Sequence, residues 1–164
     1  MRRGRTWLVV GVVAVAAVVA IAAVGCGLGG GDDATSQEDY QAAVVNSRDR
    51  VEFALARLPK AQTLEEFLER MDEAAETIDD TAGDLDDVGA PSDLVDPHER
   101  LVGQLGQLAS DIQGTADQAR VPGFEDILQG AQGLNFESWD KINAILAELR
   151  RQGIEVEPLA RQRT

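Results

Sequence analysis

A histidine next to a glutamate is the most chemically suggestive pair in this sequence. His98 is the only histidine and Glu99 follows it directly, a combination that could bind a metal ion or transfer a proton. The next residues are Arg100, Leu101 and Val102, so the HExxH zinc motif is absent. Zinc or haem would need ligands that the sequence lacks. We therefore expect His98 to be a surface or boundary residue in the first turn of a helix.

A run of acids before Gly89 resembles the start of a calcium-binding loop. Asp84 and Asp86 occupy its first and third positions, and the glycine falls at the sixth. However, Val88 stands at the fifth position and Val95 at the twelfth, where a bidentate glutamate is required. We interpret the run as the C-terminal end of a helix and predict no metal site.

Other catalytic patterns are also missing. Nucleophilic catalysis needs a base close to the nucleophile, and the sequence offers a single histidine. No GxSxG or P-loop motif occurs. The 29 acidic residues are so abundant that no one carboxylate pair is informative. We predict that the protein is not an enzyme and uses no cofactor.

Three aromatic residues, Phe124, Phe136 and Trp139, flank a glycine-broken stretch near the C-terminus. Helical bundles hold ligands between their helices, in pockets lined mainly by apolar and aromatic side chains. These residues could line such a pocket, which would make the protein a carrier or sensor of a small molecule. Trp139 is the only tryptophan after the N-terminal segment, so its fluorescence would report an occupied pocket.

The first 26 residues carry the clearest signal in the sequence. Three arginines within the first five residues precede a charge-free run, residues 6–24, which Gly25 and Cys26 follow. This order is typical of a secretory signal. Residues 22–26 resemble the lipobox of bacterial lipoproteins, in which the cysteine is acylated and becomes the mature N-terminus. That family usually has leucine three positions before the cysteine, where this chain has Ala23.

The resemblance implies a signal peptide over residues 1–25 and a lipid, such as palmitate, on Cys26. An uncleaved membrane anchor is the alternative, because residues 7–24 would form a helix about 27 Å long, close to the roughly 30 Å of a hydrocarbon core. In both cases the arginines stay cytoplasmic, so the remainder lies on the extracytoplasmic side of the cell membrane. Residues 26–35 then form a Gly-rich tether and residues 36–164 an acidic helical domain.

Charge excludes one class of partner. The formal net charge is −14, and three of the 15 basic residues lie within the first five positions. The remaining chain carries 12 basic and 29 acidic residues, a net charge of −17. Binding to nucleic acid depends largely on lysine and arginine, so we expect no nucleic-acid partner.

Capping boxes mark the starts of three long predicted helices. In such a box a polar residue is followed three residues later by an acid, and each side chain satisfies a backbone N–H of the first turn. The boxes pair Thr35 with Glu38, Thr63 with Glu66, and Asp96 with Glu99. A further helix is predicted from about residue 136 to residue 152, with Gly153 as a left-handed cap and Ile154 packing back on the helix.

Apolar residues recur every three or four positions in each segment, which predicts one buried face per helix. The clearest stripe comprises Leu64, Leu68, Met71, Ala75, Ile78, Ala82 and Leu85. Residues 124–134 predict a short accessory helix. Short connections between long helices imply antiparallel neighbours. The predicted fold is therefore all-α: an up-down antiparallel bundle of three long helices, a short accessory helix and a C-terminal helix.

Small residues gather on the third helix opposite its leucines. They are Gly103, Gly106, Ser110 and Gly114. Each interior glycine costs about 1 kcal/mol relative to alanine, and such residues let another helix approach closely. The accessory helix of the same chain is the occupant that we favour.

One aromatic residue is predicted on the outer surface. Phe53 lies opposite the apolar stripe of the first helix and is flanked by Arg50 and Arg57. The arginine stems could cover it, or it could anchor a protein partner, since aromatic residues and arginine are enriched at interface hot spots.

The predicted location at the membrane and the predicted helical fold together suggest a function. The leading hypothesis is a lipid-anchored, extracytoplasmic helical protein that serves as a binding or scaffolding module at the cell envelope, with the membrane and a protein as partners. The carrier or sensor described above is one alternative. The other is a single-span subunit of a membrane complex.

Overall fold

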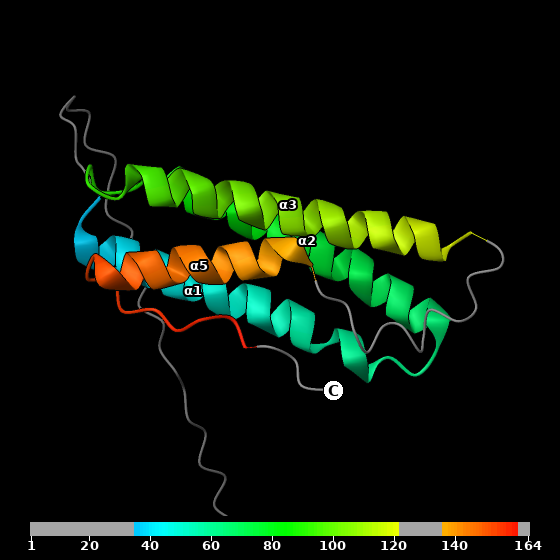
Figure 1. The fold of residues 1–164 in the computed structure, drawn as a ribbon. Coiled ribbons are helices and arrows are strands. Elements are labelled where there is room, and N and C mark those ends of the chain that lie inside the picture. Colours follow the sequence, from blue (N-terminus) through cyan, green and yellow to red (C-terminus); the bar gives the residue numbers. More distant parts are fainter. Residues whose placement is uncertain (1–34, 122–135, 161–164) are drawn as a thin grey trace, which may run out of the picture. The chain divides into compact units, whose positions relative to one another are not determined.

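The described part of the chain, residues 35–121 and 136–160 of the computed structural model, is an all-helical bundle (Figure 1). It belongs to one compact unit, Asp33–Thr164. Its elements are α1 (Gln37–Ala56), the short 3-10 helix η1 (Leu58–Lys60), α2 (Leu64–Val88), α3 (Val95–Ala119) and α5 (Glu137–Arg151). The predicted signal or anchor, the acylated cysteine and the accessory helix lie outside these residues. The described helices are all too short or too polar to span a lipid bilayer.

The first capping box lies one residue later than predicted. Ser36, not Thr35, caps α1: its Oγ accepts from the Asp39 N–H at 3.1 Å and donates to the Asp39 carboxylate at 2.6 Å. Thr35 instead donates its hydroxyl to the Val88 carbonyl at 2.7 Å, which gives a partner to a carbonyl at the end of α2. This contact draws Thr35 away from the cap position.

The second box is confirmed at Thr63, whose hydroxyl accepts from the Glu66 N–H at 3.1 Å. Glu66 reaches back one residue further than a capping box requires and accepts from the Gln62 N–H at 2.8 Å. That hydrogen bond lowers the pKa of Glu66.

The prediction of a third capping box, at Asp96 and Glu99, is wrong. The cap of α3 is Leu94, which has no capping side chain, and Asp96 lies inside the first turn. The Leu94 side chain is buried and its carbonyl accepts from the His98 N–H at 3.0 Å. Burial of Leu94 therefore sets the start of this helix two residues before the polar residue that sequence favoured.

Each helix buries one face, as predicted. On α2 the inward positions are Phe67, Met71, Ala74, Ala75, Ile78, Thr81, Ala82 and Leu85. Leu64 and Leu68, predicted to be core residues, are only partly buried beside the inward-facing Phe67. The bulkier phenyl ring takes the buried position of the first turns, and the two leucines flank it.

The end of α5 matches its prediction in detail. Gly153 has a φ of +93°, and its N–H donates to the Arg150 carbonyl at 3.2 Å. The Ile154 N–H donates to the Leu149 carbonyl at 3.0 Å, and the Ile154 side chain is buried. These two hydrogen bonds define a Schellman motif.

Two glycine substitutions should have opposite effects on stability. Gly153→Ala should lower the free energy of unfolding by about 1 to 2 kcal/mol, because a Cβ disfavours positive φ and would lie 3.2 Å from Gln37 Nε2. Gly106→Ala should raise it by about 0.5 to 1 kcal/mol, since alanine is the better helix former and no described atom lies within 4 Å of its Cβ. Urea denaturation of the chain from Asp32 to Thr164 measures both; a loss of stability in Gly106→Ala would mean that this face is already filled.

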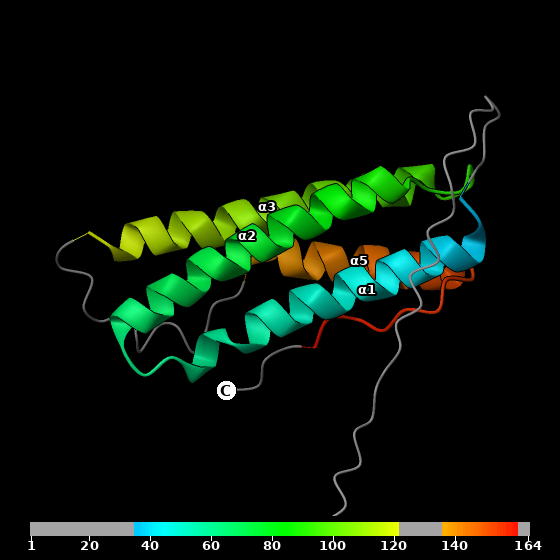
Figure 2. The same ribbon diagram turned by 180° about the vertical axis from the view of Figure 1, so that it is seen from behind.

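The helices run up, down, up and down, and α2 lies between α1 and α3 (Figures 1 and 2). Close packing joins α1 to α2, α2 to α3, and α3 to α5, whereas α1 and α5 are not among the closely packed pairs. The residues after α5 follow the seam that this leaves, in extended conformation (Figure 1). On its fourth side, between α1 and α5, the bundle is therefore closed in part by a peptide segment.

Candidate functional site

The predicted aromatic pocket is only partly described. Phe136 and Trp139 lie at the start of α5 and pack, partly buried, against the core. Trp139 Nε1 is buried and has no hydrogen-bond partner among the described residues. Phe124 and the predicted lipidation site Cys26 lie outside those residues, so the small-molecule pocket and the lipid anchor both stay predictions. A screen of cell extracts that left Trp139 emission unchanged would count against the pocket.

His98 is not a surface or boundary residue: only 5% of it is exposed. It falls three residues before Leu101 on the buried stripe of α3, so the helical period already placed it inward. Its ring meets Tyr40 of α1 edge-on, with ring centroids 5.6 Å apart and planes at 61°. His98 Nδ1 and the Tyr40 hydroxyl are both buried without a hydrogen-bond partner in the described part of the chain.

Burial shifts the pKa of both rings toward the neutral form. Desolvation lowers the pKa of His98, opposed by the nearby charges of Asp86 and Glu99, and desolvation raises the pKa of Tyr40 to about 12. Because its pKa is lowered, His98 stays neutral at pH values near 6.5, where a free histidine would gain and release a proton. It is therefore poorly suited to proton transfer. The pair is a packing contact between α1 and α3.

This burial predicts a pH dependence of stability. Because folding lowers the pKa of His98 from 6.5, the unfolded chain binds more protons just below that pH. The free energy of unfolding should therefore fall as pH drops through that window. Thermal melts of the chain from Asp32 to Thr164 at about pH 7.5 and pH 5.5 test this, with His98→Leu as control. An equal pH response in both proteins would contradict it.

Four acids of α2 are paired with arginines. Asp84 through Val88 are helical, in agreement with the helix-end interpretation. No group of three or more metal-ligating side chains that could hold an ion occurs within residues 35–121 and 136–160. The ion pairs of these acids join Arg50 to Asp84, Arg57 to Glu73, Arg70 to Glu66 and Arg120 to Asp72.

Salt should still stabilise the domain, because other like-charged neighbours on α2 have no arginine or lysine partner among the described residues. Glu65 with Glu69, and Glu76 with Asp80, are one helical turn apart, and each pair costs about 0.2 to 0.5 kcal/mol. Sodium chloride shortens the screening length to about 3 Å at 1 M, so it should raise the thermal midpoint of the chain from Asp32 to Thr164. Calcium at matched ionic strength should add nothing further. A clear calcium increment would indicate a specific site and would overturn the prediction of no metal.

Phe53 is the most exposed large apolar residue of the described surface, at 69%. Its two arginine neighbours do not cover it, because both turn toward α2: Arg50 pairs with Asp84 at 2.5 Å and Arg57 with Glu73 at 2.8 Å. The phenyl ring therefore lies bare between two interhelical ion pairs.

The small-residue face of α3 is open as far as it is described. No described atom lies within 4 Å of a Cβ built on Gly103, Gly106 or Gly114. Gly106 and Ser110 line a shallow groove between α2 and α3 together with acids of α2, among them Asp72 and Glu76. The accessory helix expected here lies outside the described residues.

The last described segment, which sequence reasoning missed, forms the most specific binding arrangement. We call residues 153–160 the tail. Ile154, Val156 and Leu159 are buried, whereas Glu155 and Glu157 between them are exposed. This alternation is visible in the sequence and is typical of an extended segment that packs on one side.

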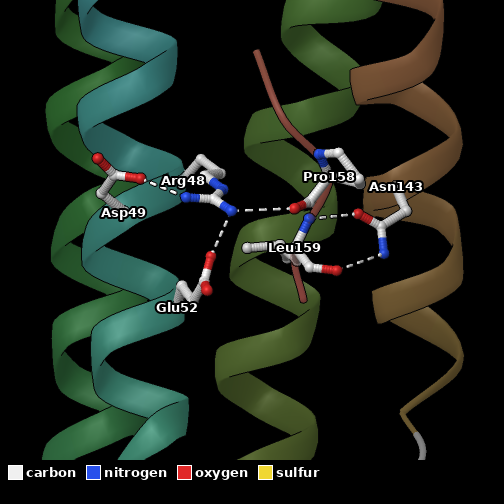
Figure 3. A network of polar contacts seen from close by, with 6 residues as sticks. All are labelled: Arg48, Asp49, Glu52, Asn143, Pro158 and Leu159. Carbon is white, nitrogen blue, oxygen red and sulfur yellow. Dashed lines mark hydrogen bonds and ion pairs between the residues drawn. The ribbon is translucent and has the colours of Figure 1, made fainter. Parts of the chain in front are cut away.

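Side chains of α1 and α5 bind the tail through its backbone. Asn143 accepts from the Leu159 N–H at 2.7 Å and donates to the Leu159 carbonyl at 3.3 Å, and Arg48 donates to the Pro158 carbonyl at 3.1 Å (Figure 3). Gln41 accepts from the Glu155 N–H at 2.9 Å. The tail lies between α1 and α5, with α3 behind it (Figure 3).

Ion pairs on α1 hold the arginine of this groove in place. Arg48 contacts Asp49 at 2.6 Å and Glu52 at 2.5 Å, so its guanidinium is fixed on three sides (Figure 3). A cavity of about 10 Å³ remains where Leu159 meets the helices. It is lined mainly by apolar side chains, among them Val44, Leu105 and Leu146, together with Ser47 and Arg48.

This arrangement can hold an extended peptide. It has an apolar floor, helical walls and polar side chains directed at backbone groups, which is how extended segments are recognised in general. Comparison of the chain with known protein families, curated proteins and solved structures gives no match. The fold is an all-α helical bundle, and the chain's own tail fills the groove between α1 and α5.

Proposed function

We propose that the protein is a lipid-anchored, extracytoplasmic binding or scaffolding module of the bacterial cell envelope. The observation that carries this proposal is the order of the first 26 residues: arginines, a charge-free apolar run, and Gly25-Cys26. Two or more acyl chains on Cys26 would hold the chain stably at the membrane surface. The Gly-rich tether would leave the acidic domain free to meet a partner.

The surface supports binding more than catalysis. Phe53 is bare beside two arginines, a combination enriched at protein interfaces. The groove between α1 and α5 already holds an extended segment through backbone hydrogen bonds. Neither feature brings together a nucleophile and a base.

Intact mass of the protein extracted from bacterial membranes tests the proposal. The expected mass is that of a chain beginning at Cys26 with acyl chains attached, and Cys26→Ser should be neither acylated nor retained in the membrane as a lipoprotein. An uncleaved chain without acyl groups would end the lipoprotein proposal and favour a single-span subunit of a membrane complex.

A further inference from the structure

We propose that the groove between α1 and α5 is a binding site for an extended segment of a partner protein, and that the tail occupies this site in cis as a displaceable ligand. The proposal rests on the proposed function, because it gives the binding module a class of ligand. The expected segment has apolar side chains at its first, third and sixth positions, as Ile154, Val156 and Leu159 provide in the tail.

The groove lies between two helices that are not among the closely packed pairs of the bundle. The tail lies between α1 and α5. In a closed bundle, side chains of the two helices would interdigitate across this seam. Here the interdigitating side chains belong to a segment that leaves α5 through Gly153, at a φ of +93°.

Recognition of the tail depends mainly on its backbone. Gln41, Arg48 and Asn143 make four hydrogen bonds to N–H and carbonyl groups of tail residues. Backbone groups are common to all sequences, so these contacts would serve any extended segment whose apolar residues match the groove. The tail's own acids, Glu155 and Glu157, face outward and leave this recognition unaffected.

The tail also fits imperfectly. The cavity where Leu159 meets the helices is lined by apolar side chains of α1, α3 and α5. Dispersion contacts are lost wherever such a gap remains. A partner segment that fills this gap would gain contacts that the tail does not make, which offsets part of the tail's advantage of being tethered.

Displacement need not unfold the bundle. α1 packs on α2, α2 on α3 and α3 on α5 directly, and the buried side chains of the tail add to the same core from its edge. The tail competes at an effective concentration in the millimolar range, which is typical of short tethered ligands. An external peptide should therefore bind weakly to the wild-type protein and much better once the tail is disabled.

The experiment uses the full chain in detergent and a fluorescent synthetic peptide of residues 153–164 as the probe. A tail variant, Ile154→Asp with Val156→Asp and Leu159→Asp, keeps its length but cannot fill the groove. Fluorescence anisotropy should show at least about tenfold tighter binding of the probe to this variant than to wild type. Adding Asn143→Ala to the tail variant should weaken that binding about tenfold, because it removes two hydrogen bonds to the peptide backbone.

Each outcome decides the proposal. If the tail variant is unfolded by circular dichroism, recovery of helix on addition of the probe supports it, and no recovery overturns it, because the tail would then be a fixed part of the core. A folded variant that binds no probe, or binds it equally with Asn143→Ala, also overturns it. In the milder variant Leu159→Ala, the probe should bind with intermediate affinity.

Measurement of the oligomeric state distinguishes a groove that binds a different protein from one that binds the tail of a second copy of this chain. Dimers of wild type that dissociate when the probe is added would show that the groove takes the tail of another copy, which would overturn a partner ligand. The test does not depend on acylation, since binding is measured in detergent whatever the mass of the N-terminus. Failure of the groove and failure of the lipid anchor are therefore distinguishable.

Discussion

Replacement of Ile78 by alanine should lower the free energy of unfolding by about 2 to 5 kcal/mol, the range for removing a large aliphatic side chain from a core. Ile78 is fully buried on α2, the helix that lies between α1 and α3, so neither neighbour can move into the cavity without losing its own contacts. Urea denaturation of the chain from Asp32 to Thr164 measures this loss.

Two controls on the same helix sharpen the result. Leu68→Ala should cost clearly less, because Leu68 is only partly buried and solvent can occupy the vacated space. Glu69→Ala should cost almost nothing or stabilise, because it removes a negative charge from an exposed position between other acids. A similar loss at Ile78 and Glu69 would show that the inward face of α2 is assigned wrongly.

Ile154→Asp should release the tail and leave the helices folded. The substitution puts a carboxylate where a fully buried isoleucine stood, which is too costly to keep without a partner. Because the tail can leave the groove, the loss of stability is limited to the free energy of tail docking, about 2 to 4 kcal/mol if one buried aliphatic anchor dominates it. By contrast, Ile78 lies on a helix packed between two others, so its side chain cannot leave the core unless the bundle unfolds.

Hydrogen exchange distinguishes local release from global unfolding. The Leu159 amide, which donates to Asn143, should exchange about 30- to 700-fold faster in Ile154→Asp. Amides of α2 and α3 should change far less. Glu157→Ala is the matched control, since that side chain is exposed on the same segment. Uniform acceleration across all helices would show that the tail and the bundle unfold as one unit.

Local signals in the sequence predicted much of this fold. The helices, the Thr63 cap and the Gly153 cap all follow from short patterns whose physics is contained within a few residues. Where two adjacent apolar residues could each take the buried position, the sequence pattern alone does not decide between them. Phe67 and Leu68 are both apolar and a quarter turn apart, and only packing against the neighbouring helices selects the phenyl ring.

The candidate site was harder to predict than the helices. The helical period of α3 indicates a buried position for His98, whereas a histidine in the first turn of a helix is more often a surface or boundary residue. The tail carries a readable alternation, but its partners Gln41 and Arg48 lie more than a hundred residues earlier. A single sequence carries no local signal for so distant a contact, and the seam between α1 and α5 exists only in the assembled bundle.

The long-range contacts of the tail lead us to expect that it docks late in folding. Its hydrogen bonds to α1 join positions 110 and 114 residues apart, whereas each helix hairpin joins neighbours along the chain. Closing so long a loop costs more entropy than closing a hairpin, so local hairpins assemble first and the tail docks last. Synthesis imposes the same sequence, because the tail leaves the ribosome after all the helices to which it binds. We therefore expect a newly made molecule to pass through a stage in which the groove is built but empty, and a competing peptide would not have to displace the tail during that stage.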